Sequence, residues 1–173
     1  PEAIKFAPLI KELQKHKESF NVKVCSTGQH KEMLKQILDF FNIEPDYNLN
    51  LMTHNQSLAE FAAKAMISLD KVIGQLMPDL VIVQGDTTST LMGAQCSYFR
   101  KVKIAHLEAG LRSHKKFSPF PEELNRKLTG HLADFHFAAT ERNQRDLSKE
   151  GITDNIWVTG NTVIDALFLC LKK

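Results

Sequence analysis

Four acidic residues fall at places where a predicted strand gives way to a predicted helix. They are Asp86 after the apolar run at 79–84, Glu108 in AHLEAGLRS, and Glu122 and Glu123 in PFPEELNR. Because all strands of a parallel sheet end at the same edge, residues far apart in sequence converge there. Neighbouring negative charges and partial burial raise the pKa of some carboxyl groups, so a proton donor and a proton acceptor can coexist near neutral pH. The pattern therefore predicts proton-transfer chemistry at one edge of a sheet.

Most of these acids also have a structural explanation. Asp86 could cap the helix that follows it, although the next residue is a hydroxyl that could do the same. Glu122 and Glu123 stand in the first turn of a helix, where the helix dipole alone favours acids. Glu108 lacks a comparable explanation, because it ends an apolar strand two residues before Gly110. Glu108 is therefore the strongest single candidate for a catalytic group.

Five further residues near these acids could contact a substrate. Thr87 and Thr88 could hydrogen-bond a sugar or a phosphate, or could cap the helix. His106 could point to the same side as the acid two residues later, or could be a core histidine with its hydrogen bonds satisfied. Arg112 and Arg126 could bind an anion, or could be solvated surface charges. The histidines of the chain show no paired-ligand spacing, so no metal site is predicted.

The strand at 79–84 organises the predicted fold. It is a continuous apolar run between Pro78 and Gly85, typical of a strand that is buried on both faces. Alternating strands and helices of this length indicate βαβ units, and so a doubly wound parallel α/β sheet of Rossmann-like class. The other strands are expected at 21–27, 45–51, 102–107, 134–139 and 155–159, and the helices at 1–16, 30–42, 57–77, 88–100, 121–132, 141–149 and from 162.

The chain of 173 residues is long enough for one domain with a substantial core. A helix that begins at residue 1 would leave the sheet without a central strand, and the helix from 162 has an apolar face that requires a partner. We therefore expect residues 1–173 to form one Rossmann-like domain that lacks its first strand and belongs to a longer protein.

The composition of the chain bears on its binding partners and on the cellular compartment in which it is expected. A net charge of +2 without a dense basic run gives no indication of nucleic-acid binding, and no apolar stretch approaches the length of a membrane span. Cys25, Cys96 and Cys170 form no CxxC pair, and the first two lie in apolar patterns. We expect free thiols, buried at Cys25 and Cys96, and a reducing cytoplasmic location.

Six segments, in this order and spacing, resemble the non-hydrolysing UDP-N-acetylglucosamine (UDP-GlcNAc) 2-epimerases of bacteria. They are PEAIKFAPLI, TGQHKEML, VIVQGDTTSTL, AHLEAGLRS, PFPEELNRKLTGHLADFHFAAT and VTGNTVIDAL, which together run over essentially the whole chain. The resemblance implies a two-domain GT-B architecture, of which this chain is the N-terminal domain and from which the C-terminal nucleotide-binding domain is absent. It also implies a homodimer.

The resemblance implies a reaction as well. The family interconverts UDP-GlcNAc and UDP-N-acetylmannosamine (UDP-ManNAc) without a nicotinamide or metal cofactor. The proton at carbon 2 of the sugar is removed and UDP leaves, and UDP adds back with reprotonation on the other face. The family's catalytic carboxylates correspond to Asp86, Glu108 and Glu122, with the base and the acid unassigned among them. Glu2 and Lys5 of the PEAIK segment are expected near the substrate.

Some members carry a second UDP-GlcNAc site that activates them. The resemblance places Gln29, His30 and Glu32 at that site. Such members tend to carry Arg at a position in the THNQSL segment where this chain has Asn55, which weakens the expectation of regulation.

Four other functions stay open from the sequence. A hydrolysing epimerase would release ManNAc and UDP, and a related epimerase would act on a UDP-diacetamido sugar. A GT-B glycosyltransferase would share the fold without needing three converging acids on this domain. A non-catalytic nucleotide-sugar binding domain would use the acids only as helix caps.

Overall fold

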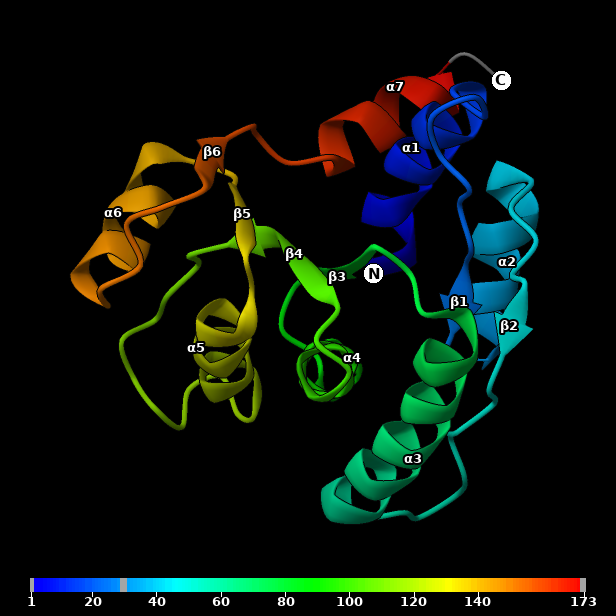
Figure 1. Cartoon of the computed structure of the whole chain (residues 1–173), viewed down its shortest axis with the longest axis horizontal. Coiled ribbons are helices and arrows are strands. Elements are labelled where there is room, and N and C mark those ends of the chain that lie inside the picture. Colours follow the sequence, from blue (N-terminus) through cyan, green and yellow to red (C-terminus); the bar gives the residue numbers. More distant parts are fainter. Residues whose placement is uncertain (1, 29–30, 172–173) are drawn as a thin grey trace. The chain divides into compact units, whose positions relative to one another are not determined.

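The computed structural model describes residues 2–28 and 31–171, without the side chains of residues 31 and 32. Figure 1 shows helices flanking short parallel strands, the Rossmann-like α/β class that the alternating pattern predicts. The chain divides into two compact units. The smaller unit is Pro1–Gln56 with Asn161–Lys173, and the larger unit is Ser57–Gly160. Each unit is described by itself.

The larger unit contains one parallel sheet in the order β3-β4-β5-β6. Right-handed connections between successive strands in this order place the connecting helices on one face, where α4 and α5 contact each other (Figure 1). The elements are α3 (Leu58–Leu76), β3 (Leu80–Gln84), α4 (Thr88–Phe99), β4 (Lys103–Ala109), α5 (Glu122–Leu132), β5 (Phe135–Ala138), α6 (Glu141–Lys149) and β6 (Ile156–Val158).

Small side chains bring α4 close to this sheet. Gly93, Ala94 and Ser97 are among the buried residues of α4, and a Cβ atom on Gly93 would lie 3.2 Å from Val83 of β3. Val83, Ala94 and Ile104 form a buried cluster between the helix and the strands. This close packing fixes the start of α4 against the end of β3, which is where the predicted acids begin.

The smaller unit contains α1 (Glu2–Lys15), β1 (Cys25–Ser26), α2 (Lys31–Phe41), β2 (Tyr47–Asn48) and α7 (Val163–Leu171). Ala7, Phe41, Ile43 and Ala166 form its core. β1 and β2 pair in parallel, and their hydrogen bonds extend from the carbonyl of Val24 to that of Thr27. The strands predicted here are therefore present but shorter. In the described residues the strands form two parallel ladders, β1-β2 in the smaller unit and β3-β4-β5-β6 in the larger unit.

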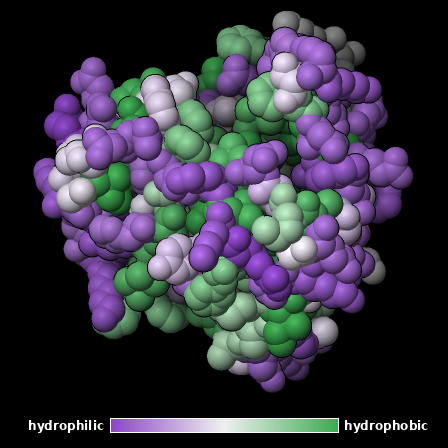
Figure 2. Space-filling model, viewed as in Figure 1, coloured by the Kyte–Doolittle hydropathy of each residue, from purple (hydrophilic) through white to green (hydrophobic). Residues whose placement is uncertain are grey.

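The cysteines are free thiols, as expected. Cys96 is buried, but the expectation that Cys25 is buried is wrong. The alternation of β1 turns Ser26 inward and leaves Cys25 exposed. Among the described residues, no helix is long and apolar enough to cross a membrane. On the face drawn in Figure 2 hydrophilic residues alternate with apolar ones, and both units expose large apolar side chains.

A substitution at Gly110, just after β4, tests how closely α6 packs against the end of this strand. Its φ is +82°, and a Cβ atom there would lie 2.2 Å from the carbonyl oxygen of Asn143 in α6. Gly110→Ala should lower the free energy of unfolding by about 3 kcal/mol or more, since it combines a disfavoured backbone with a collision.

Gly151→Ala is the matched control for this prediction. Gly151 has φ +83° with nothing within 4 Å of an added Cβ atom, so only the backbone cost of about 1 kcal/mol is expected. Chemical unfolding measures both variants, and equal losses would contradict the close approach of α6.

Candidate active site

The turn after β3 presents Asp86 and lets Thr87 cap the next helix. Gly85 has φ 75° and donates its backbone N–H to the carbonyl of Leu107 on β4 (3.1 Å). Thr87 is the N-cap of α4, with its hydroxyl accepting from the Thr90 amide at 3.3 Å. Because Thr87 performs the capping, the carboxylate of Asp86 is left for another role.

The end of β4 presents Glu108 in an uncommon backbone conformation. Its φ is 61°, in the left-handed region, and the register with β5 shifts between Leu107 and Ala109. A β-bulge with a non-glycine residue in this region re-aims a side chain at the cost of strain, and such strain clusters at functional sites. Gln84 Nε2 donates to Glu108 Oε2 at 2.8 Å, which joins the ends of β3 and β4.

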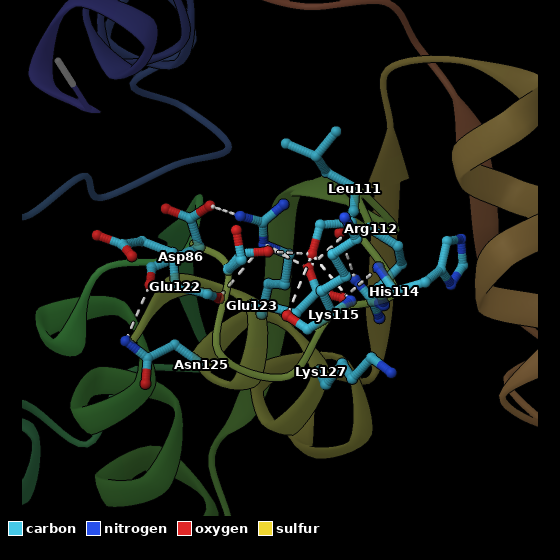
Figure 3. A network of polar contacts seen from close by, with 12 residues as sticks. Asp86, Leu111, Arg112, His114, Lys115, Glu122, Glu123, Asn125 and Lys127 are labelled. Carbon is cyan, nitrogen blue, oxygen red and sulfur yellow. Dashed lines mark hydrogen bonds and ion pairs between the residues drawn. The ribbon is translucent and has the colours of Figure 1, made fainter. Parts of the chain in front are cut away.

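The first turns of α5 supply the third acid and an arginine. Arg126 NH2 lies 2.9 Å from Asp86 Oδ2, and Arg126 Nε donates to the backbone carbonyl of Glu122 at 3.3 Å. Asn125 Nδ2 donates to the Asp86 carbonyl at 3.0 Å. α5 therefore contacts the turn after β3 through both Arg126 and Asn125. The carbonyl of Glu122 belongs to the same polar network through Arg126 (Figure 3).

The adjacent glutamates have different surroundings. Glu122 is partly exposed, whereas Glu123 is fully buried. Burial alone would raise the pKa of Glu123, but hydrogen bonds from Ser113 and His114, with the charge of Arg126, hold that pKa below its usual value. Figure 3 shows Glu123 directed toward the loop of His114 and Lys115, and Glu122 directed away from it.

His106 is a core residue of β4. Its side chain is 0% exposed, and Nε2 lies 2.7 Å from the Gly85 carbonyl oxygen. Burial lowers the pKa of His106 to about 4, so the ring is neutral at pH 7 and Nε2 donates its proton to that carbonyl. His106 supports the turn before Asp86, and its geometry favours the core interpretation over substrate contact.

Arg112 is occupied by a buried ion pair. Its guanidinium contacts the Glu150 carboxylate through NH2 at 2.7 Å and through Nε at 3.0 Å, and its side chain is 0% exposed. Burial alone would raise the pKa of Glu150, but Arg112 and Lys127 hold that pKa below its usual value. This arrangement explains Arg112 as a structural residue of the larger unit.

The structure places Asp86 after β3, Glu108 near the end of β4 and Glu122 at the start of α5, all partly exposed. Gln84 holds the Glu108 carboxylate, and Arg126 contacts the Asp86 carboxylate and the Glu122 carbonyl. Sequence reasoning missed Gln84 and Asn125 as members of the network. The signal available for Gln84 was a polar residue at the end of an apolar strand. Asn125 could have been found from its place one turn after the paired glutamates.

Other predicted site residues lie elsewhere. Thr88 is buried in the first turn of α4, while Glu2 and Lys5 belong to α1 of the smaller unit, where a role in binding stays a prediction. Among the described residues, no group of three or more His, Cys, Asp or Glu side chains could hold a metal ion.

The predicted regulatory residues can be followed only in part. Gln29 and His30 lie outside the described residues, and Glu32 belongs to α2 without a described side chain. The smaller unit has an open pocket of about 480 Å³ beyond the ends of β1 and β2, lined by Gly28, Asn50, Met52, Thr53, His54 and Asn55.

Fold and site together define a class: a Rossmann-like α/β domain with partly exposed carboxylates near the carboxyl ends of its parallel strands. The sequence model of the UDP-N-acetylglucosamine 2-epimerase family matches residues 11–173. The chain belongs to this family. A relative from Neisseria meningitidis serogroup A, a UDP-N-acetylglucosamine 2-epimerase, is 49% identical over 174 residues, which are 100% of this chain and 46% of the relative.

Solved structures agree with this assignment. The chain is similar to the UDP-GlcNAc 2-epimerase of Neisseria meningitidis bound to UDP-GlcNAc, with a TM-score of 0.96 and 49% identity over 99% of this chain and 46% of that one. It is also similar to the Methanocaldococcus jannaschii UDP-GlcNAc 2-epimerase in complex with UDP-GlcNAc and UDP, with a TM-score of 0.93 and 39% identity over 99% and 47% of the two chains. The chain thus spans about half the length of these relatives.

Arg112→Met should lower the free energy of unfolding by up to about 3 kcal/mol, because it removes the nearer partner of the partly buried Glu150 carboxylate and leaves only Lys127, whose Nζ lies 3.3 Å away. Arg145→Met is the control, since Arg145 is 66% exposed and forms only a surface pair, and a change within about 0.5 kcal/mol is expected. Chemical unfolding at pH 7 compares the two variants.

The effect of Arg112→Met should shrink in acid. The folded pKa of Glu150 lies below the ordinary 4.5, so the pair stabilises the fold above that pH and loses this contribution as the pH falls through the lowered value. A variant of unchanged stability that binds substrate poorly would contradict the structural role and indicate direct substrate contact.

Proposed function

We propose that this chain is the N-terminal domain of a two-domain GT-B enzyme that interconverts UDP-GlcNAc and UDP-ManNAc. The observation that carries the proposal is the set of three partly exposed carboxylates, Asp86, Glu108 and Glu122, which follow β3, end β4 and begin α5 at one edge of a parallel sheet. The family membership indicates the substrate, because a relative with the same fold and 49% sequence identity has been solved in complex with UDP-GlcNAc.

The proposed reaction uses the carboxylates as proton donor and acceptor. One group takes the proton from carbon 2 of the sugar, and the bond from carbon 1 to the UDP oxygen breaks to leave a 2-acetamidoglucal. UDP then re-forms its bond to carbon 1 while a proton is delivered to the opposite face of carbon 2. Two acids flanking the sugar and a third nearby provide the two-sided proton transfer that inversion at carbon 2 requires.

The remaining assignments are also part of the proposal. Arg126 sets the orientation of the Asp86 carboxylate, and Thr87 offers its hydroxyl near the substrate. No nicotinamide or metal cofactor takes part. A homodimer, a cytoplasmic location and an activating UDP-GlcNAc site at Gln29, His30 and Glu32 remain predictions from the family.

The proposal is tested by proton NMR of UDP-GlcNAc in heavy water with the full-length protein that contains this chain. Reversible proton transfer should place deuterium at carbon 2 of the sugar and produce UDP-ManNAc. Free ManNAc with UDP would instead identify a hydrolysing epimerase. An unchanged sugar without exchange would exclude this substrate and direct the search to a UDP-diacetamido sugar or a glycosyltransferase.

Glu108→Gln should lower kcat for epimerisation by about 10²–10⁴-fold, because the amide cannot exchange a proton with the sugar. Glu18→Gln is the control for the chemical change, since the Glu18 side chain is 71% exposed and lies on the smaller unit. The Kd for UDP-GlcNAc, measured by calorimetry, should change little in either variant. A Glu108 variant with full turnover would exclude Glu108 as a catalytic group, and absence of turnover in the parent protein as well would support a non-catalytic binding domain.

A further inference from the structure

Glu123 is a fully buried acid of the larger unit that the proposed reaction does not use. Glu123 is 0% exposed, although a glutamate in the first turn of a helix could remain in water at little cost. A helix-dipole contact alone would not require this burial, because the dipole acts on exposed acids as well. The burial of Glu123 must therefore be explained by the contacts that its carboxylate makes.

Glu123 holds the loop between β4 and α5. Its Oε2 accepts the backbone N–H of Ser113 at 2.9 Å, and its Oε1 accepts that of His114 at 3.0 Å. Its own backbone N–H donates to the carbonyl of Pro119 at 3.1 Å. One residue thereby fixes both ends of the loop against the start of α5. Two successive amides on one carboxylate are charge-assisted hydrogen bonds, about twice as strong as neutral ones.

Glu123 also faces the arginine that holds Asp86. Arg126 Nε lies 3.7 Å from Glu123 Oε2, and Arg126 NH2 lies 2.9 Å from Asp86 Oδ2. Arg126 is 6% exposed, so its orientation is set by these two acids and by the Glu122 carbonyl rather than by water. Contacts therefore run without interruption from the loop through Glu123 and Arg126 to Asp86.

We propose that Glu123 is a positioning residue for the reaction: it locks the loop at 113–119 and Arg126 so that Asp86 and Glu122 keep a fixed mutual orientation. This inference rests on the proposed epimerase function. Arg126 is paired with two acids, Asp86 and Glu123, so these three side chains carry one net negative charge. Glu123 contributes one of the two negative charges beside Arg126. Glu123 itself does not touch the substrate.

Glu123→Gln in the full-length protein tests the proposal. The amide keeps the size of the side chain, but it has one acceptor oxygen in place of two and no charge. We expect kcat to fall about 10–100-fold with KM for UDP-GlcNAc within about threefold, because orientation and not binding is lost. The acidic limb of the kcat/KM profile should move to lower pH, because a network with one negative charge fewer holds protons less tightly.

Glu141→Gln is the matched control. Glu141 also stands in the first turn of a helix, α6, and its side chain is 80% exposed. Its kcat and pH profile should equal those of the parent. Wild-type kcat and an unshifted profile in Glu123→Gln would overturn the proposal and leave Glu123 with a purely structural role. If the parent protein itself shows no proton exchange at carbon 2 of UDP-GlcNAc, the proposed function is refuted instead.

Glu123→Asp is the second variant, and it applies also when Glu123→Gln does not fold. Aspartate keeps the charge but is one methylene too short to reach both amides and Arg126. The proposal expects a lower kcat with an unshifted acidic limb, because geometry changes and charge does not. Wild-type kcat in Glu123→Asp would overturn it.

Discussion

The buried ion pairs at the start of α5 are the interaction on which the site depends. Arg126 is shared between Asp86 and the fully buried Glu123, so each acid helps to orient the guanidinium group that the other one contacts. An unpaired buried charge costs several kcal/mol, so the three side chains are fixed as a set. This pairing joins two loops that come from different strands, and it sets where the exposed carboxylates can point.

The end of β4 is held by a different constraint. Glu108 adopts a left-handed backbone at a β-bulge, and Gly110 lets the chain pass so close to Asn143 of α6 that no side chain fits. The strain at Glu108 is balanced by the packing of α6 and by the hydrogen bond from Gln84. The hydrogen bond from Gln84 fixes the Glu108 carboxylate beside the end of β3.

The neutral core of the sheet supports both features. His106 lies fully buried beside the turn that carries Gly85, and its lowered pKa keeps it uncharged at pH 7. Arg112 neutralises Glu150 at the other end of the loop between β4 and α5. Buried charges of this unit are thus paired locally, whereas Asp86, Glu108 and Glu122 are partly exposed. Membership of the UDP-N-acetylglucosamine 2-epimerase family agrees with such a site.

The sequence by itself determined the α/β class, most element positions and the three strand-end acids, because periodicity and turn residues are local and parallel strands must end at one edge. The family resemblance singled out Glu122, but the residue pattern itself could not distinguish Glu122 from Glu123, or a substrate-binding arginine from a paired one. These differences depend on which partner lies within about 3 Å in space. The partners of Glu123 are Ser113 and His114, which are ten and nine residues away in the chain. Only the tertiary structure decided them, because burial and ion pairing are set by packing between elements and not by neighbours in sequence.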